Sequence, residues 1–417
     1  MSHPTTTEEL PVGSVLEVTV ETVAHGGHCV ARHEGRVLFV RHTLPGERVR
    51  ARVTGEGPGG RFLRADAVEV LEPAAGRVEP PCPYAGPARC GGCDWQHADL
   101  ATQRELKRAV VLEQFDRLAG IDLPAALGRD VVVEPVPGDE AGLRWRTRVE
   151  FAVDGTGRPG LRGHRSHEVI PVEDCMIARD AVVGTGVLRR RFPGQRAVDV
   201  IAPSGGEPVL VPVPGGTERA PLVLERVPTP TGTGEFEFGV AARGFWQVHP
   251  GAPETFLRTV LGWLDPRPGE RALDLYAGVG LFAAALADAV GDSGRVHAVE
   301  GDRLAVEHAR DNLTPWAGVR VTRDRVDRAV RRMARAGERA DLVVLDPPRS
   351  GAGKAVVRDV ARLGPRAVAY VACDPAALAR DVGYARDAGL DLVDLRVFDA
   401  FPMTHHMECI ALLVPAG

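Results

Sequence analysis

The N-terminal part of the chain alternates short apolar runs with turns. From Gly13 to about Glu72 the segments SVLEVTVETVA, HCVARHEGRVLFVRHTLPGERVRARV and RFLRADAVEVLEP have the alternating apolar and polar positions of strands. Short strands at this spacing are typical of a small, OB-like β-barrel. We therefore expect a β-barrel domain over residues 11–72.

Basic side chains are frequent on these predicted strands. They are Arg32, His33, Arg36, Arg41, His42, Arg48, Arg50 and Arg52. Such a density suits contacts with nucleic-acid phosphates, so the barrel is a candidate nucleic-acid-binding domain. A solvated barrel face with no partner explains the charge equally well.

The region from residue 73 to residue 250 has a less regular pattern. It begins with PAAGRVEPPCPYAGPARCGGCDWQH, a Pro- and Gly-rich stretch typical of a linker, and continues with the helical pattern LATQRELKRAVVLEQFDRLAG. From about Val131 to Val240, strand-like segments are separated by turns at DGTGRPG, PSGG and TGTG. We expect a central, mainly antiparallel β domain here that also carries a cysteine cluster.

Beyond residue 251 the pattern changes to strands that alternate with helices. The segments are RALDLYAG, LFAAALADAV, RVHAVE, RLAVEHARDNL and VRVTRD, in that order. This alternation predicts a doubly wound α/β catalytic domain over residues 251–417. A nucleotide-like ligand should bind at the carboxyl ends of its strands.

Composition narrows the class of protein without identifying it. The chain has 417 residues, of which 44% are hydrophobic and 26% charged, and no apolar run long enough to cross a bilayer, so we expect no membrane partner. The start, MSHPTTTEELP, lacks the pattern of a secretory signal, which favours a reducing, cytoplasmic compartment without disulfides. The net charge of -5 argues against coating nucleic acid over the whole surface but allows a local basic face.

A Gly-rich turn after the first strand of the α/β region is the candidate cofactor site. It comprises Ala277–Gly280, and Glu300 follows at the end of the next strand, where a carboxylate can hold ribose hydroxyls. The turn fits a methyltransferase and a nicotinamide oxidoreductase equally well. Asp346, followed by Pro347, Pro348 and an arginine, favours a base-modifying methyltransferase, although a plain Asp-Pro turn is the simpler alternative.

Cys373 and Glu408 are the candidate catalytic residues. Cys373 follows an apolar strand and precedes a helix, whose dipole should help its thiol lose a proton, although an inert buried cysteine is the ordinary alternative. Addition of a thiolate to C6 of uracil makes C5 nucleophilic, and a base must later remove the C5 proton. Glu408, just before the last apolar strand, is the best candidate base, with His405 and His406 less suitable, although a surface glutamate without a catalytic role is an equally good alternative.

Four further cysteines have the spacing of a metal site. Cys82, Cys90 and Cys93 form C-x7-C-x2-C, and Cys175 is a possible fourth ligand. Four thiolates suit zinc or an iron–sulfur cluster. A zinc ribbon usually has two C-x2-C pairs, so the single pair favours the cluster. Cys29 and Cys409 remain as structural thiols.

These motifs, in this order, resemble the RNA 5-methyluridine (uracil-C5) methyltransferase family of the type that contains a TRAM domain and an iron–sulfur cluster. The resemblance covers nearly the whole chain through GRVLFVRHTLPGERV, the cysteine cluster, GFWQVHP, DLYAGVGLF, DPPR, ACDP and THHME. It implies a class I fold dependent on S-adenosylmethionine (SAM), and a monomer that acts on structured RNA, with ribosomal RNA favoured over transfer RNA.

The resemblance also assigns roles to individual residues. It implies Cys373 as nucleophile and Glu408 as base, and a 4Fe-4S cluster, with zinc as the alternative, on the four spaced cysteines. The implied SAM contacts are Gln247, Tyr276, Glu300, Asp346 and Asp324.

The chain departs from the family pattern at four positions. Ala372 and Asp374 replace a Ser and an Asn, His249 replaces an Asn, and Leu281 stands where a polar residue is usual. The change at Asp374 leaves the identity of the target base open. The altered loop also permits a non-catalytic RNA-binding assembly factor, and a nicotinamide-dependent oxidoreductase is the third alternative.

Overall fold

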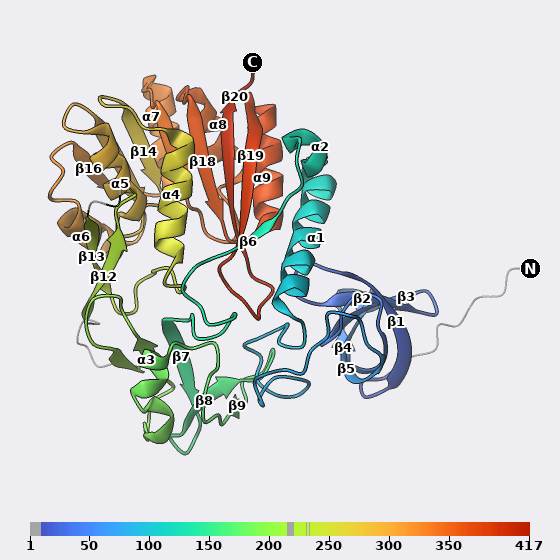
Figure 1. Cartoon of the computed structure of the whole chain (residues 1–417). Helices are drawn as coiled ribbons and strands as arrows, with labels where there is room; N and C mark the ends of the chain where they lie inside the picture. Colours follow the sequence, from blue (N-terminus) through green and yellow to red (C-terminus); the bar gives the residue numbers. More distant parts are fainter. Residues whose placement is uncertain (1–9, 215–220, 231, 233) are drawn as a thin grey trace, which may run out of the picture. The chain divides into compact units, whose positions relative to one another are not determined.

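The computed structural model describes residues 10–214, 221–230, 232 and 234–417 (Figure 1). Thr231 and Thr233 of the predicted TGTG turn lie outside the described residues. The chain divides into two compact units: the first contains the residues up to Leu106 together with Arg162–Ile170 and Met403–His405, and the second contains the rest. Among the described helices, none combines the length and the apolar character needed to cross a membrane.

The first unit contains the predicted barrel. Its strands close in the order β1-β2-β3-β5-β4. Along β1 the residues Leu16, Val18 and Val20 are buried while the intervening residues are exposed, which is the expected alternation of a barrel strand. The bounds are β1 (Val15–Val23), β2 (Cys29–His33), β3 (Arg36–Arg41), β4 (Arg48–Glu56) and β5 (Leu63–Glu72). The predicted N-terminal barrel is therefore confirmed.

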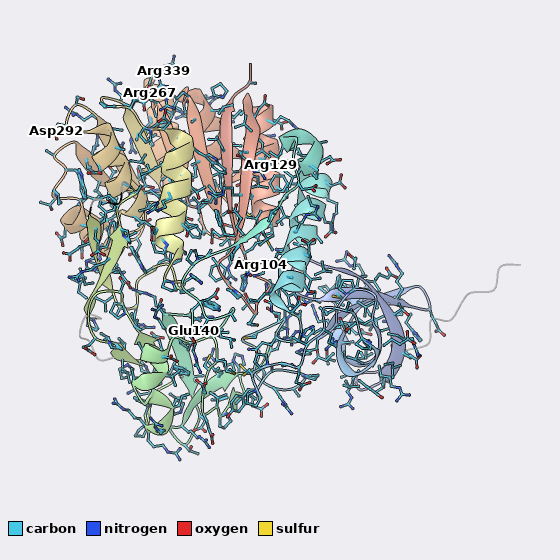
Figure 2. The ribbon with its side chains drawn as sticks, in the orientation of Figure 1. Arg104, Arg129, Glu140, Arg267, Asp292 and Arg339 are labelled. Carbon is cyan, nitrogen blue, oxygen red and sulfur yellow. The ribbon has the colours of Figure 1, made fainter. Side chains whose placement is uncertain are left out.

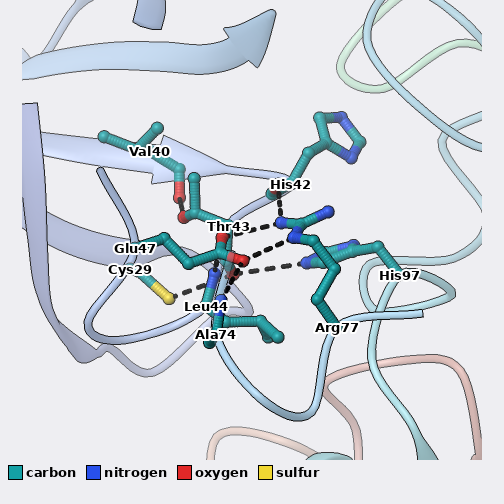
Figure 3. Close-up of polar contacts among 9 residues, drawn as sticks. All are labelled: Cys29, Val40, His42, Thr43, Leu44, Glu47, Ala74, Arg77 and His97. Atoms are coloured by element: carbon teal, nitrogen blue, oxygen red, sulfur yellow. Dashed lines mark hydrogen bonds and ion pairs between the residues drawn. The ribbon is translucent and has the colours of Figure 1, made fainter. Parts of the chain in front are cut away.

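A buried carboxylate fixes the loop between β3 and β4 (Figure 3). Glu47 is fully buried and accepts hydrogen bonds from Arg77 Nη2 at 2.7 Å and from the Leu44 N–H at 2.8 Å. Burial alone would raise the pKa of Glu47, but these hydrogen bonds outweigh it and hold the pKa below its usual value. The loop is therefore tied to the segment that follows the barrel.

Most basic residues of the barrel strands are balanced by nearby carboxylates. Arg50 lies 2.8 Å from Glu69, Arg36 lies 3.3 Å from Glu56, and Arg48 pairs with carboxylates on both neighbouring strands. The strands on which these arginines lie do not form a uniformly basic face, because paired glutamates offset the charge that the sequence counts. The number of arginines alone therefore overstates how basic the surface of these strands is.

The second unit contains the central β region and the α/β domain. In the central region β11, β10, β7 and β8 are neighbours in antiparallel pairs, and β12 pairs antiparallel with β13, which confirms the predicted mainly antiparallel character. The bounds are β6 (Val133–Pro135), β7 (Arg148–Val153), β8 (Pro159–Arg162), β10 (Ala197–Ile201), β11 (Val209–Val213), β12 (Leu222–Pro228) and β13 (Glu235–Ala241). Strand β9 (Val169–Ile170) belongs to the first unit.

The α/β domain is built on an eight-stranded sheet of order β16-β15-β14-β17-β18-β20-β19-β6. Strands β14 to β18 run parallel, while β20 is antiparallel to both β18 and β19. The bounds are β14 (Arg271–Leu275), β15 (Arg295–Glu300), β16 (Val319–Arg323), β17 (Leu342–Leu345), β18 (Ala367–Ala372), β19 (Leu390–Asp399) and β20 (Glu408–Pro415). The predicted α/β fold is confirmed.

Helices cover the faces of this sheet. In Figure 1, α4 lies in front of the strands that it contacts, β18 and β20, while α9 contacts β18, β19 and β20 from behind. The helices are α1 (Leu100–Ala119), α2 (Leu123–Leu127), α3 (Asp180–Gly184), α4 (Ala252–Leu264), α5 (Leu281–Val290), α6 (Arg303–Asn312), α7 (Val326–Ala336), α8 (Gly353–Arg362) and α9 (Pro375–Asp387). The boundary between the two units falls within α1.

One strand of the sheet comes from outside the predicted catalytic region. The short β6 pairs parallel with β19, and Arg129, between α2 and β6, donates to the carbonyl oxygen of Leu395 at 3.1 Å (Figure 2). Three residues are too few to show a strand pattern in the sequence. The pairing nevertheless extends the sheet beyond the predicted boundary at residue 251.

Candidate active site

The turn after β14 has the backbone conformation of a ligand-binding loop. Tyr276 and Gly280 both have positive φ, at 65° and 100°, and Gly280 is the residue from which α5 starts. A Cβ on Gly280 would lie 2.9 Å from Leu313 Cδ1, so a larger residue there would meet both strain and a clash. The sequence correctly indicated a tight strand-to-helix turn at this place.

Glu300 fixes this turn from the neighbouring strand. Its Oε2 accepts the Gly278 N–H at 2.9 Å, and its Oε1 accepts the N–H groups of Gly301 at 2.6 Å and Asp302 at 2.7 Å. Oε2 accepts only one of these bonds and so still has acceptor capacity left. Glu300 is thus positioned at the strand end to receive hydroxyl donors while it holds the glycine loop.

Asp274 is a candidate site residue that the sequence analysis did not single out. It lies within β14 and is fully buried, and neither carboxylate oxygen makes a hydrogen bond of standard geometry with the described residues, although the Ala283 N–H lies close to it. Burial raises its pKa to about 8; the Ala283 N–H opposes this shift, and the nearby Asp346 and Glu300 carboxylates add to it. An orphaned buried carboxyl directly before the glycine loop fits a site that a polar ligand completes. Its position in the motif DLYAG is the signal that could have revealed it.

Three further predicted cofactor residues differ in their surroundings. Gln247 is buried in the loop before α4, and Tyr276 is half-buried, with burial raising its pKa to about 12. Asp324 follows β16, and its carboxylate accepts the Arg325 N–H and pairs with Arg332, both at 2.8 Å. Asp324 is therefore already engaged within the protein.

Cys373 lies where the sequence predicted, between β18 and α9. The next residue, Asp374, caps α9: its Oδ1 accepts the Ala377 N–H at 2.8 Å. Asp and Asn cap helices about equally well, so this departure from the family pattern keeps the local structure. The expected lowering of the thiol pKa is not found, because burial first, and then Glu408, raise the pKa of Cys373 to about 11.

Glu408 is brought to Cys373 by the pairing of two strands. Ala372 of β18 is paired with Cys409 of β20, so the residues next to them, Cys373 and Glu408, are neighbours. Glu408 is buried rather than on the surface. Burial, and then the Asp346 carboxylate, raise the pKa of Glu408 well above its usual value.

Asp346 and Arg349 complete this group. Asp346 directly follows β17, and burial, followed by the Glu300 carboxylate, raises its pKa to about 7. The Arg349 guanidinium opposes these shifts, since it lowers the pKa of both Cys373 and Glu408. Arg349 is the counter-charge of the group, a role that the sequence motif did not reveal.

The two alternative bases lie in different environments. His405 belongs to the first unit, where its Nδ1 is 2.7 Å from Asp94 Oδ2. His406 belongs to the second unit and packs edge-on against Phe401. His249, the residue that replaces an Asn, is fully buried and stacks on Trp145.

None of the four spaced cysteines forms a disulfide, and three of them share one loop of the first unit, Cys82–Cys93. The Gln96 amide accepts the Cys82 N–H at 3.1 Å and donates to Cys93 Sγ at 3.2 Å. The Gly92 N–H donates to Cys90 Sγ at 3.4 Å. Two of the three sulfur atoms thus accept hydrogen bonds, as ligating thiolates do.

The fourth cysteine, Cys175, is buried in the second unit. Across the described ranges, no three His, Cys, Asp or Glu side chains are arranged so that they could hold a metal ion. Cys29 and Cys409 are both buried, in agreement with structural roles.

Comparison with known families matches both ends of the chain. Residues 9–68 match the TRAM domain, and residues 253–415 match the family described as tRNA (Uracil-5-)-methyltransferase. An RNA methyltransferase of Streptomyces coelicolor, described as uncharacterized, is 52% identical, with 97% of this chain and 94% of the relative covered. The 23S rRNA (uracil(1939)-C(5))-methyltransferase of Chromohalobacter salexigens is 34% identical, with 95% and 88% covered.

A solved structure has the same fold over nearly the whole chain. It is the Pyrococcus abyssi tRNA (uracil-54, C5)-methyltransferase in complex with S-adenosyl-L-homocysteine. The TM-score is 0.68 at 20% identity, and the match covers 95% of this chain and 99% of that chain.

Proposed function

Because this chain belongs to the TRAM-containing RNA uracil-C5 methyltransferase family and uses SAM as methyl donor, we propose that it methylates C5 of a uridine in ribosomal RNA through a covalent bond to Cys373. The observation that carries this proposal is the register of β18 and β20, which makes Cys373 and Glu408 neighbours. A nucleophile and a buried carboxyl side by side are the two groups that the chemistry needs.

The reaction follows from these groups. The thiolate of Cys373 adds to C6 of the uracil ring, and the electron pair moves to C5, which takes the methyl group from the sulfonium of SAM. The carboxylate of Glu408 then removes the C5 proton, the C5–C6 double bond forms again, and the bond from C6 to sulfur breaks. The products are 5-methyluridine, S-adenosylhomocysteine and the regenerated thiolate.

The raised pKa values of the catalytic groups fit a site that binds a cationic methyl donor. Cys373, Asp346 and Glu408 all have raised pKa values in the protein without ligand, which disfavours the ionised forms of the thiol and the carboxyls. A positive charge close to these groups favours their ionised forms. The sulfonium of SAM, together with Arg349, would therefore help to ionise the nucleophile and the base.

Support for a ribosomal target comes from one relative. The enzyme that is 34% identical over almost the whole chain is described as acting on 23S rRNA, whereas the tRNA-modifying neighbour is only 20% identical and shows the fold alone.

The test of the ribosomal target is mass spectrometry of separated rRNA and tRNA from a strain that lacks the protein. We expect 5-methyluridine to fall in the rRNA fraction; a loss confined to tRNA would reject the ribosomal target.

The residues around the glycine loop fit SAM. The loop allows close backbone approach, the Glu300 carboxylate suits the ribose hydroxyls, and the unsatisfied Asp274 carboxyl points to a polar ligand. Gln247, Tyr276 and Asp346 complete the proposed contacts. Asp324 is the weakest member, since its carboxylate already pairs with Arg332.

Replacing Glu300 by alanine should weaken SAM binding by about 1.5–3 kcal/mol, because charge-assisted hydrogen bonds to the ribose would be lost. Titration calorimetry with S-adenosylhomocysteine measures this change. Asp324→Ala is the matched control and should cost less than about 1 kcal/mol, since its carboxylate is held by Arg332. Unchanged affinity in Glu300→Ala would reject the assignment.

We further propose that Cys82, Cys90, Cys93 and Cys175 hold a 4Fe-4S cluster. The family resemblance, the single C-x2-C pair and the N–H donors to Cys90 and Cys93 support this donor set. The cluster would supply a structural cross-link, because four cysteines leave no iron open for substrate.

Anaerobically purified protein should therefore contain about four iron and four sulfide per chain, with the broad visible absorption of such a cluster. Cys90→Ser should lower the iron content, while Cys29→Ser, which alters a buried cysteine outside the set, should not. Stoichiometric zinc without iron would show that the alternative metal is bound.

A further inference from the structure

A cavity of about 510 Å³ lies within the first unit, on the side of the barrel that faces the segment Arg162–Ile170. Its walls come from β3 to β5 with the adjoining His28 and Phe62, from Ala88 and Arg89, and from this segment, all of which belong to the same unit. The size is that of a pocket for a small molecule or a single nucleotide.

Backbone hydrogen bonds hold the wall of the cavity that lies outside the barrel. The Gly91 N–H donates to the Arg162 carbonyl oxygen at 3.0 Å, and the Gly163 N–H donates to the Glu168 carbonyl oxygen at 3.2 Å. The approach is so close that a Cβ on Gly91 would lie 2.5 Å from the His164 nitrogen. The loop Cys82–Cys93, which carries three of the spaced cysteines, and the segment Arg162–Ile170 therefore form one wall of the cavity.

Aromatic rings line the barrel side. Phe39 packs edge-to-face against Phe62, with ring centroids 5.0 Å apart, and His28 packs against Phe39 at 5.5 Å. All three are only partly buried. Burial lowers the pKa of His28 to about 4, so this ring is neutral at neutral pH. Partly exposed rings in a basic cavity are the surfaces on which proteins stack unpaired bases.

A donor and an acceptor lie side by side in the cavity. Arg41 and Asp66 are register partners on β3 and β5. Arg41 is only 9% exposed, and its Nη2 has no hydrogen-bond partner among the described residues, although it forms an ion pair with Asp94 Oδ1 at 3.8 Å. Burial raises the pKa of Asp66. An unsatisfied buried guanidinium nitrogen next to a carboxyl is costly unless a ligand uses it.

Cations lie on the same walls. Arg64 places its guanidinium 5.2 Å from the centre of the Phe62 ring, and Arg89 and Arg165 are exposed. Unlike Arg48 and Arg50 on the barrel strands, none of these three has an ion pair with a carboxylate in the described part of the chain. They are suited to hold a phosphate at the mouth of the cavity.

We propose that this cavity binds one unstacked guanosine of the substrate RNA, separate from the uridine that is methylated. The base would lie against Phe39 and Phe62. Arg41 would donate to the O6 and N7 acceptors of guanine, and Asp66 would accept from its N–H donors. Arg64 and Arg165 would hold the adjacent phosphate. This inference rests on the proposed action on RNA and adds a second point of recognition to it.

The test uses the full-length protein and fluorescein-labelled RNA hexamers in an anisotropy titration. The probes are U6 and hexamers in which the third uridine is replaced by guanosine, adenosine or inosine. We expect the guanosine hexamer to bind about tenfold or more tighter than U6, since one bidentate base contact discriminates to that extent. Inosine, which lacks the exocyclic amino group, should fall between guanosine and adenosine. Equal binding of all four probes, or a preference for adenosine, would overturn the proposal.

Variants then test whether the preference for guanosine arises in this cavity. Asp66→Asn and Arg41→Gln should abolish the preference for guanosine, whereas Arg50→Gln, on the barrel surface and paired with Glu69, should keep it. If Arg50→Gln loses the preference as well, or if Asp66→Asn keeps it, the cavity is not the site. The comparison of the four probes with the natural chain needs no variant, so a folding defect cannot hide the answer.

Methylation is measured separately by nucleoside mass spectrometry. Formation of 5-methyluridine without a guanosine preference would overturn the pocket and leave the proposed function standing. A guanosine preference without 5-methyluridine would support the pocket and count against the proposed function.

Discussion

Cys373→Ala should reduce methyl transfer to RNA to the background of the assay, a loss on the order of 10⁴-fold or more, as removal of a covalent nucleophile does in other enzymes. The physical reason is that C5 of uracil carries too little electron density to take a methyl group until C6 has received the thiolate. The measurement is transfer of the labelled methyl group from SAM to RNA, with binding of S-adenosylhomocysteine measured alongside to show that the cofactor site is intact.

Asp374→Asn is the matched control for this loss. Asn would keep the cap of α9 that the Asp374 carboxylate now makes with the Ala377 N–H, so the loop should keep its shape and the enzyme should remain active. The same control removes one carboxylate that raises the pKa of Cys373. If Cys373→Ala transfers methyl groups at a rate close to that of the natural protein, covalent catalysis through this residue is wrong.

Glu408→Gln should fail in a different way, because it removes the base but not the nucleophile. The enzyme should still form the bond to C6 and methylate C5, and then stop before elimination, with turnover reduced by about 10²–10⁴-fold. The arrested complex should migrate as a protein–RNA band on a denaturing gel and carry the label of the methyl donor. Since burial raises the pKa of Glu408 well above its usual value and so disfavours the charged form, a neutral amide of the same shape should change the stability little.

Two further variants make this result specific. The double variant Cys373→Ala with Glu408→Gln should give no band, because no bond to C6 can form. His406→Gln tests the other candidate base of the same unit and should turn over normally. Normal turnover by Glu408→Gln would remove it from the mechanism and make the histidines the next candidates.

Local patterns in the sequence predicted much of the fold and the place of the candidate site. The alternation along β1, the strand-to-helix turn at Gly280 and the position of Cys373 before α9 all depend on residues close together in the chain. Such features follow from side-chain periodicity and from the backbone freedom of glycine. The roles of Cys373, Glu408 and the cofactor residues stay predictions until the experiments above are done.

Features that depend on contacts between distant segments could not be predicted from local sequence patterns. The joining of β6 to β19, and the inclusion of Arg162–Ile170 in the unit of the barrel, bring together segments far apart in the sequence. The balance of Arg50 by Glu69 depends on strand register rather than on charge count. The raised pKa of Cys373 follows first from burial and then from Glu408, which lies on another strand, so it could not be predicted from the helix start that follows Cys373 in the sequence.

The central claim is that this enzyme methylates C5 of uridine, and the most direct measurement is made on the product. The purified protein is incubated with unmethylated rRNA transcript and SAM carrying a deuterated methyl group, and the RNA is then digested to nucleosides for mass spectrometry. The account predicts 5-methyluridine with three deuterium atoms, absent when Cys373→Ala is used. Deuterium on a ribose or on another base, or no labelled nucleoside from an enzyme that binds SAM, would contradict it.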